Sequence, residues 1–289
     1  MAGYTAATNI GELIPEITNE VQYIYQNVSV GPDLVTFQDV SGIPGTVVEF
    51  PRFTEVVGST GVAETAAPAS HQMDLSMPTL TLARRAVYVG LSDLAKKGAR
   101  GNVVSQIGSA MAMSKAKQDD ALIFGVLTAT TNWGTGTGAT NAALTITNAL
   151  DALNLLEKNE VSEQIYCVVH PHQYKSIRSA LTPIANDDAV AVGIASDMAR
   201  DAFVSRAFGM NWFVTARIGS GTVTATANVY NGLVFAKSAI GYAHSWGEVN
   251  GVEADRQASL GLTDLILNYF NQAGVIYGSG VAKLYSTSA

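Results

Sequence analysis

The stretch that decides the fold is Thr46-Val-Val-Glu-Phe-Pro-Arg-Phe-Thr-Glu-Val-Val57, which Thr79-Leu-Thr-Leu82 and Ala86-Val-Tyr-Val89 follow along the chain. β-Branched and aromatic residues dominate these segments and predict extended strands. Pro51 lacks a backbone N–H, so it confines the first strand to an edge or a hairpin. Residues 58–76 are small, polar and weakly apolar, as in a loop tip. The pattern predicts a long two-stranded finger, which is barely stable alone and should lie on something, with a neighbouring copy as a natural candidate.

A long helix is predicted after the finger. Asn102 can cap a helix that runs from Val103 to Leu127. About 25 helical residues would span about 37 Å, more than twice the mean helix length, so we interpret this helix as a structural spine. One row along it is only partly apolar and consists of Ile107, Met111, Ser114, Gln118 and Leu122.

A second helix is predicted before the finger. Apolar residues at spacings of three and four form one stripe over residues 14–28, namely Ile14, Ile17, Val21, Ile24 and Val28. Two interpretations stay open: a helix of the core, or an arm that packs on a neighbouring subunit.

The rest of the chain alternates between helices and strands. Over residues 142–240 we expect a helix at 148–158 with Leu150, Leu153 and Leu156 inward, a buried strand at 165–169, helices at 173–181 and 195–208 (the latter closed by Gly209), a strand at 211–215, a turn or hairpin tip at 220–226, and strands at 228–230 and 233–235. This block is typical of an α/β domain. The last block, 241–289, is strand-like and is expected to return to the spine helix.

Composition excludes several classes of protein. Apolar residues make up 47% of the 289 residues, which excludes disorder for the bulk of the chain. Charged residues make up only 14%, against about 25% in an average soluble domain, which indicates extensive burial against other copies or a merely neutral surface. The single Cys167 excludes an intrachain disulfide. The sequence shows neither a signal peptide nor an apolar run long enough to span a bilayer.

Charge is distributed unevenly along the chain. Residues 1–95 hold ten acids and three bases, whereas residues 96–289 hold fourteen of each. The net charge of −7 argues against general nucleic-acid binding. We predict that acidic finger residues of one subunit meet a basic group on its neighbour. The predicted contact residues are Glu49, Glu55, Glu64, Asp74, Lys96, Lys97, Arg100, Lys115 and Lys117. Exposed pairs contribute about 0.2–1 kcal/mol each, so they would set register more than strength, and the alternative is that the lysines are simply solvated.

Candidate catalytic and metal-binding residues are few. His170 and His172 could ligate a metal if a third ligand were near, although a strand end followed by a helix start explains the spacing better. Cys167 lies in an apolar strand, where a thiol is usually inert. Asp119 and Asp120 point about 100° apart on the spine helix and are interpreted as solvated or interface acids. We therefore expect no catalytic site, metal site or cofactor.

The order of these elements resembles the major capsid proteins of tailed double-stranded DNA bacteriophages, the Hong Kong 97-type fold. Stretches that carry the likeness are Phe37-Gln-Asp-Val40 with Thr46-Val-Val-Glu-Phe-Pro51, Val62-Ala-Glu64, Val89-Gly-Leu-Ser-Asp93, Asp119-Asp-Ala-Leu-Ile-Phe-Gly125, Val168-Val-His-Pro171, Leu233-Val-Phe-Ala-Lys-Ser-Ala-Ile-Gly-Tyr242, Gly274-Val-Ile-Tyr277 and Val281-Ala-Lys-Leu284. The likeness covers nearly the whole chain, and the order of the pieces is what is specific. Encapsulin nanocompartment shells share the fold and are the alternative.

The resemblance implies an α+β fold with an N-terminal arm (1–45), an E-loop (46–90), a P-domain with the spine helix (91–141), an A-domain (142–240) and a C-terminal segment that returns to the P-domain (241–289). It implies a structural protein, not an enzyme, whose copies form the hexamers and pentamers of an icosahedral shell around double-stranded DNA. Covalent cross-linking through an E-loop lysine is excluded, because residues 46–90 contain no lysine.

Further partners also follow from the resemblance. A portal protein and packaged DNA without sequence-specific contacts are expected, and no membrane. A separate cement protein could add stability. The arm helix starts almost at Met1, so either scaffolding is a separate protein or a leader has been removed. The expected location is the virion capsid, after assembly in the host cytoplasm.

Overall fold

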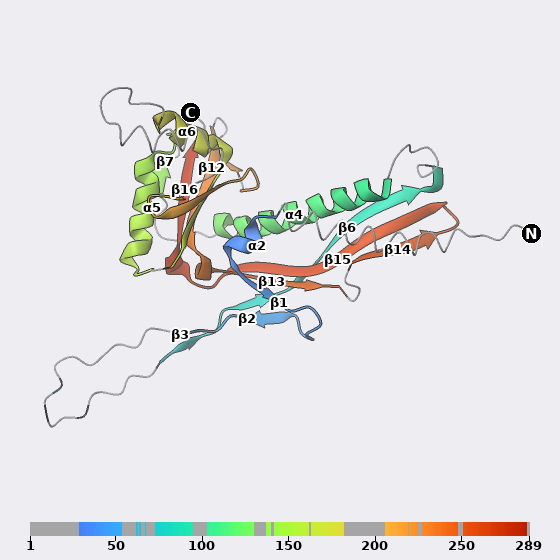
Figure 1. Cartoon of the computed structure of the whole chain (residues 1–289), viewed down its shortest axis with the longest axis horizontal. Coiled ribbons are helices and arrows are strands. Elements are labelled where there is room, and N and C mark those ends of the chain that lie inside the picture. Colours follow the sequence, from blue (N-terminus) through green and yellow to red (C-terminus); the bar gives the residue numbers. More distant parts are fainter. Residues whose placement is uncertain are drawn as a thin grey trace, which may run out of the picture.

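Two sheets share one long helix in the computed structural model of the chain (Figure 1). The structure describes residues 29–53, 62, 64, 67, 73–94, 103–129, 137–139, 142–161, 163–181, 206–218, 220–224, 227–247 and 251–287. The fold is α+β, as predicted. Within the described residues, no helix combines the length and the apolar character needed to cross a membrane.

The first sheet has five strands and lies along the helix α4 (Val103–Ala129). Its long central strand β15 pairs with β6 on one side and with β13 and β14 on the other, and β1 forms an edge parallel to β13. The strands are β1 (Thr36–Asp39), β6 (Ala83–Ser92), β13 (Ile240–Trp246), β14 (Val252–Gln257) and β15 (Leu262–Val275). The predicted spine helix is confirmed, and it covers one face of this sheet (Figure 1).

The second sheet has seven strands in the order β7-β16-β12-β8-β10-β9, with β11 paired to β12. The strands are β7 (Thr137–Ala139), β8 (Ile165–Val169), β9 (Arg206–Ala207), β10 (Met210–Val214), β11 (Ser220–Thr224), β12 (Ala227–Ala236) and β16 (Val281–Thr287). Two helices, α5 (Ile146–Lys158) and α6 (Pro171–Leu181), pack on it. Thr145 caps α5, because its hydroxyl accepts a hydrogen bond from the Asn148 N–H at 3.3 Å.

Strand β8 is buried along its whole length because its two faces serve two cores. Ile165, Cys167 and Val169 pack with Leu153 and Leu156 of α5. Tyr166 and Val168 face the other way, toward the end of α4. This explains why the segment has no polar alternation and why sequence predicts it as a buried strand, which is confirmed.

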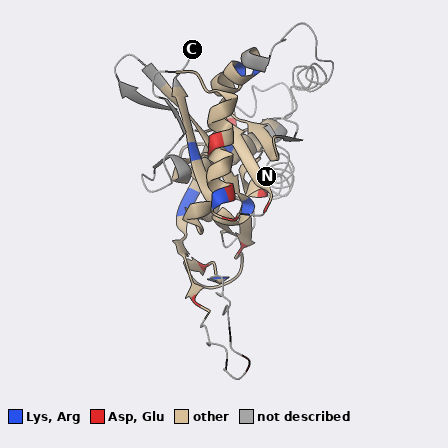
Figure 2. Cartoon of the chain, turned by 90° about the vertical axis from the view of Figure 1, so that its left-hand side faces the viewer, with Lys and Arg blue, Asp and Glu red and all other residues tan. Residues whose placement is uncertain are grey.

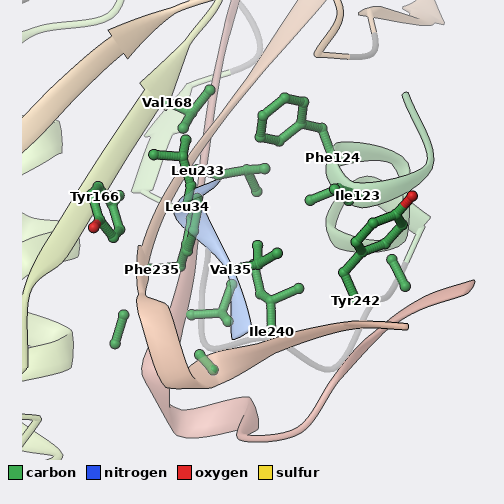
Figure 3. Close-up of a cluster of buried hydrophobic side chains, with 14 of the residues drawn as sticks. Leu34, Val35, Ile123, Phe124, Tyr166, Val168, Leu233, Phe235, Ile240 and Tyr242 are labelled. Atoms are coloured by element: carbon green, nitrogen blue, oxygen red, sulfur yellow. The ribbon is translucent and has the colours of Figure 1, made fainter. Parts of the chain in front are cut away.

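The core between the two sheets is apolar (Figure 3). Ile123 and Phe124 of α4 meet strand residues of the seven-stranded sheet, and Leu34 of the short helix α2 (Gly31–Leu34) packs in the same cluster. Ile240 and Tyr242 of β13 complete it from the five-stranded sheet. The 3₁₀ turns η1 (Lys237–Ala239) and η2 (Gly278–Gly280) lie where the chain passes between the sheets.

Several sequence predictions need correction. Leu150 is 38% exposed, so only Leu153 and Leu156 of the predicted trio point inward. Residues 206–207 form β9 instead of ending a helix, and the positive φ angles of Phe208 (56°) and Gly209 (79°) make the tight turn to β10. Residues 220–224 of the predicted turn or hairpin tip at 220–226 form strand β11, which pairs antiparallel with β12. The helix predicted at 14–28 and most of the one at 195–208 lie outside the described residues.

Strand assignment to the sheets also differs from the prediction. Strand β6 pairs with β15 over ten residues and so belongs to the five-stranded sheet, not to the finger. The C-terminal block divides: β13, β14 and β15 lie on the spine side, but β16 pairs with β12 and β7 of the seven-stranded sheet. Which sheet a strand joins depends on contacts with distant segments, which its own pattern does not encode.

Candidate functional site

Several apolar side chains are exposed along the finger, which starts from the five-stranded sheet. It is built from β2 (Val47–Glu49), β3 (Arg52–Phe53), β4 (Leu75–Ser76) and β5 (Thr79–Thr81). β2 pairs with β5 and β3 with β4, both antiparallel. This confirms the predicted hairpin, and Figure 1 shows β3 extending away from both sheets.

The root of the finger is seated firmly. Val48, Phe50 and Leu80 are buried in one cluster with Val40 and Ala243 of the sheet. Close approach is possible because the underlying strands carry glycine. A Cβ on Gly274 would overlap the Leu80 side chain, and one on Gly241 would lie 3.1 Å from the Phe50 ring.

A cation–π contact adds to this root. The Arg52 guanidinium carbon lies 3.4 Å from the centroid of the Tyr277 ring. The root therefore fixes the direction in which the finger leaves the body.

Beyond its root, the described part of the finger is not paired to either large sheet. β3 and β4 pair only with each other, through Arg52 with Ser76 and Phe53 with Leu75. Phe53 is 61% exposed, and Met73, Leu75 and Met77 are exposed as well. Two paired residues per strand do not make a stable ribbon, and a run of exposed apolar side chains marks a contact surface. These exposed apolar side chains make this part of the finger a candidate contact surface.

The nine charged residues predicted to make contacts fall into three groups: exposed residues, residues outside the described part of the chain, and the buried Lys115. Glu49, Glu64 and Asp74 are exposed on the finger, where acidic residues recur in Figure 2, and Lys117 is exposed on α4. Glu55, Lys96, Lys97 and Arg100 lie outside the described residues. The exposed acids thus lie on the finger and the exposed Lys117 on α4, in different parts of the subunit.

Lys115 corrects the prediction. It is fully buried, and its Nζ lies 2.7 Å from Asp119 Oδ2, one helical turn further along α4. Nζ also lies 4.7 Å from the Tyr269 ring centroid and 5.0 Å from that of Trp246. Burial lowers the Lys115 pKa, and the Asp119 charge opposes this shift. Lys115 is therefore an internal cation of the subunit and is not available to a neighbour's finger.

Asp119 and Asp120 also correct the prediction, because both are fully buried and neither is solvated. They do point to different surroundings, as expected for adjacent helical positions. Asp119 accepts a hydrogen bond from Asn271 Nδ2 at 2.6 Å, besides its ion pair with Lys115. The i, i+4 spacing of Lys115 and Asp119 was a signal for this pair in the sequence; nothing local signalled the partners of Asp120.

His170 and His172 stack on an aromatic ring, and Cys167 is buried in a strand. His170 lies between the end of β8 at Val169 and the start of α6 at Pro171, and the rings of His170 and His172 stack on Tyr230 at 4.4 and 4.6 Å between centroids. Burial and the neighbouring His172 lower the pKa of His170. Among the residues that the structure describes, no three His, Cys, Asp or Glu side chains form a group that could hold a metal ion. Cys167 is buried in β8, where burial raises the pKa of its thiol.

Comparison with known proteins identifies the family. The family model described as phage capsid protein matches residues 76–282. The chain belongs to the phage capsid protein family. No curated protein sequence matches the chain.

Solved capsids share the fold of this capsid protein. The capsid of Ralstonia phage GP4 superposes with a TM-score of 0.67 at 10% identity, over 89% of this chain and 87% of that one. The capsid of cyanophage P-SCSP1u gives 0.66 at 18% identity, over 90% and 89%. Mycobacterium phage Che8 gives 0.63 at 20% identity, over 89% and 90%. These likenesses confirm the predicted Hong Kong 97-like fold.

A virus-like particle from Pyrococcus furiosus also has this fold, with a TM-score of 0.54 at 10% identity, over 94% of this chain and 98% of that one. The family match favours the phage capsid protein over the encapsulin-type alternative. The protein is a structural protein of a bacteriophage capsid, as predicted.

Proposed function

We propose that this capsid protein closes, as many identical copies, into an icosahedral shell, and that its finger lies across an adjacent subunit. The observation that carries this proposal is the distal finger, where Phe53 and Leu75 are exposed on a strand pair that, among the described residues, joins no other strand. Covering these side chains would favour association, since buried apolar area contributes about 25 cal/mol per Å². Each subunit would make several such contacts, so weak contacts would sum to a strongly held shell.

The arrangement in hexamers and pentamers belongs to the same proposal. The division into arm, E-loop, P-domain, A-domain and returning segment describes how we expect each part to serve the shell. The acidic Glu49, Glu64 and Asp74 would set the register of the finger on a neighbour, and Lys117 is the described base that remains exposed for such pairing. Exposed pairs are weak, so their contribution is to orientation.

We further propose that the shell encloses double-stranded DNA without sequence-specific contacts. The net charge of −7 supports this, because a shell wall without a basic surface would not bind tightly to the phosphates of the enclosed DNA. A portal protein would complete the shell, and separate scaffolding and cement proteins are compatible with the proposal. The shell would be assembled in the host cytoplasm and reside in the virion.

The test compares two substitutions at one exposed position. Phe53→Asp places a charge in the proposed contact, whereas Phe53→Leu keeps an apolar side chain. Because the ring is exposed, both subunits should fold like the wild type by circular dichroism. We expect electron microscopy and sedimentation to show a severalfold loss of closed shells for Phe53→Asp and near-normal yield for Phe53→Leu.

Two results would overturn the proposal. Normal shells from Phe53→Asp would exclude the finger contact, and a wild-type protein that stays monomeric or dimeric under assembly conditions would exclude the shell itself. Nuclease-protected DNA in native particles tests the cargo. Shells that enclose only protein would favour the encapsulin-type alternative.

A further inference from the structure

A single buried carboxylate lies where the two sheets of the subunit meet. Asp120 of α4 is fully buried. Its Oδ1 accepts hydrogen bonds from the Gly31 backbone N–H at 2.8 Å and from the Ser29 hydroxyl at 3.2 Å. Its Oδ2 accepts from Nη1 of Arg217, with which it forms an ion pair.

The three partners of Asp120 come from different parts of the fold. Ser29 and Gly31 lie in the segment that leads into β1 of the five-stranded sheet, and Arg217 follows β10 of the seven-stranded sheet. Gly31 and Arg217 are 89 and 97 residues from Asp120 in the sequence. The carboxylate thus links the spine helix, the entry to one sheet and an end of the other.

The preceding residue offers a contrast. Asp119 bonds to Lys115 on the same helix and to Asn271 of β15, so these contacts stay within the spine and the five-stranded sheet. The two adjacent buried acids therefore have different roles. Asp119 holds α4 to the five-stranded sheet, whereas Asp120 connects α4 to residues next to both sheets.

The apolar core beside Asp120 holds the two sheets together, but apolar contacts do little to fix the angle between them. Ile123 and Ile218, close in sequence to Asp120 and Arg217, belong to the cluster shown in Figure 3. Hydrophobic contact is non-directional, whereas charge-assisted hydrogen bonds have defined geometry. The approach is also tight, because a Cβ on Gly31 would lie 2.9 Å from both Asp120 Oδ1 and Ile123 Cδ1.

We propose that Asp120 is a positioning residue that fixes the angle between the two sheets and thereby the curvature of the shell. The inference rests on the proposed shell function. In a closed assembly the same surfaces recur in every subunit, so a small change of angle is repeated around each ring and alters closure. Loss of the Asp120 contacts should therefore change the size of the particles more than it changes the fold of the subunit.

The test in dispersed subunits needs no assembly. Asp151 on α5 is exposed, and Leu260 in the turn between β14 and β15 is 71% exposed, so Asp151→Cys and Leu260→Cys offer one spin-label site on each unit. The buried Cys167 would be replaced by alanine in all variants to leave these two sites. We expect Asp120→Asn and Arg217→Gln to broaden the label-to-label distance distribution. Asp119→Asn is the matched control and should leave that distribution at the wild-type width, although it lowers stability.

The same variants without labels test curvature. We expect particles of Asp120→Asn and Arg217→Gln to show a broad range of diameters and open sheets by electron microscopy, with Arg217→Lys closer to the wild type. Asp119→Asn should give fewer particles of wild-type diameter. Unchanged distances and diameters in both Asp120→Asn and Arg217→Gln, or equal broadening in Asp119→Asn, would overturn the inference. Absence of shells from the wild type would instead overturn the proposed function, while the distance measurement would still decide the role of Asp120.

Discussion

The two sheets bury different kinds of side chain against their helices. Between α5 and the seven-stranded sheet the core is apolar, with Leu153, Leu156 and Trp212 among its members. Between α4 and the five-stranded sheet, an apolar cluster that includes Met111, Leu265 and Leu267 is accompanied by a buried polar network. The members of this network are Lys115, Gln118, Asp119, Tyr242, Tyr269 and Asn271.

This difference has physical consequences for the two interfaces. The apolar core is stabilised by burial and dense packing, and it tolerates other apolar side chains of similar volume. The polar network is stable only while every member keeps its partner, because an unpaired buried charge is costly. Apolar packing thus holds α5 on its sheet without fixing its exact position, whereas the polar contacts of α4 allow only one position on its sheet. A fixed position suits a spine helix that connects the two sheets of a shell subunit.

The largest effect is expected when the network loses its cation. Lys115→Met should lower the free energy of unfolding of the dispersed subunit by about 3–5 kcal/mol, since Asp119 is left as an unpaired buried charge. Chemical denaturation at low protein concentration measures this. The double variant Lys115→Met with Asp119→Asn removes both charges and should lose less than Lys115→Met alone. A double variant that loses the sum of the two single effects would contradict the network.

The second prediction concerns the apolar core between α5 and the seven-stranded sheet, where no charge is left unpaired when a side chain is shortened. Leu156→Ala should lower the free energy of unfolding by about 2–5 kcal/mol, because the cavity lies in a packed interior. Leu150 of the same helix is the matched control. Its side chain is 38% exposed. Leu150→Ala should therefore lower the free energy of unfolding by only about 0.5 kcal/mol, as is usual at surface sites. Equal losses at the two positions would mean that α5 is turned differently on its sheet.

The same contrast explains what the sequence could and could not reveal. Strand β8 and the helix α5 follow from local periodicity, because β8 is apolar along its whole length and α5 along one side, whereas the row along α4 is only partly apolar. The pairing of β6 with β15 could not be derived, since its ten residue pairs join positions 170 to 188 residues apart. The length of α4 predicted a spine, but a lysine in contact with a neighbouring subunit and a solvated or interface acid were expected where Lys115 and Asp119 bury their charges together.

The site was predictable in outline only. The lack of lysine, the acidic residues and the extended strands of the finger can be read from residues 46–90, but the exposed apolar side chains of Phe53 and Leu75 were not predicted as contact residues. The link through Asp120 cannot, because Ser29, Gly31 and Arg217 reach it only after both sheets have formed.

The smallest effect concerns a histidine at the edge of the network. His244 of β13 is buried, and its Nε2 has no hydrogen-bond partner among the described residues. The groups around it are Asp39, Phe37, Lys115, Tyr242, Trp246 and Tyr269. Burial, with the nearby Lys115 charge, lowers the pKa of His244 from 6.5 to about 3, and Asp39 opposes this shift.

This shift makes stability depend on pH in a defined direction. Between pH 6.5 and 3 the unfolded chain binds a proton at His244 and the folded chain does not, so stability falls as the pH falls. The contribution of this residue should be about 2 kcal/mol between pH 7 and 5. His244→Phe removes the titrating group and the unpartnered nitrogen. We therefore expect the variant to gain on the wild type by about that amount over this range, in urea denaturation of dispersed subunits. Since all other titrating groups are common to both proteins, parallel pH profiles would show that His244 is protonated or solvated in the folded subunit.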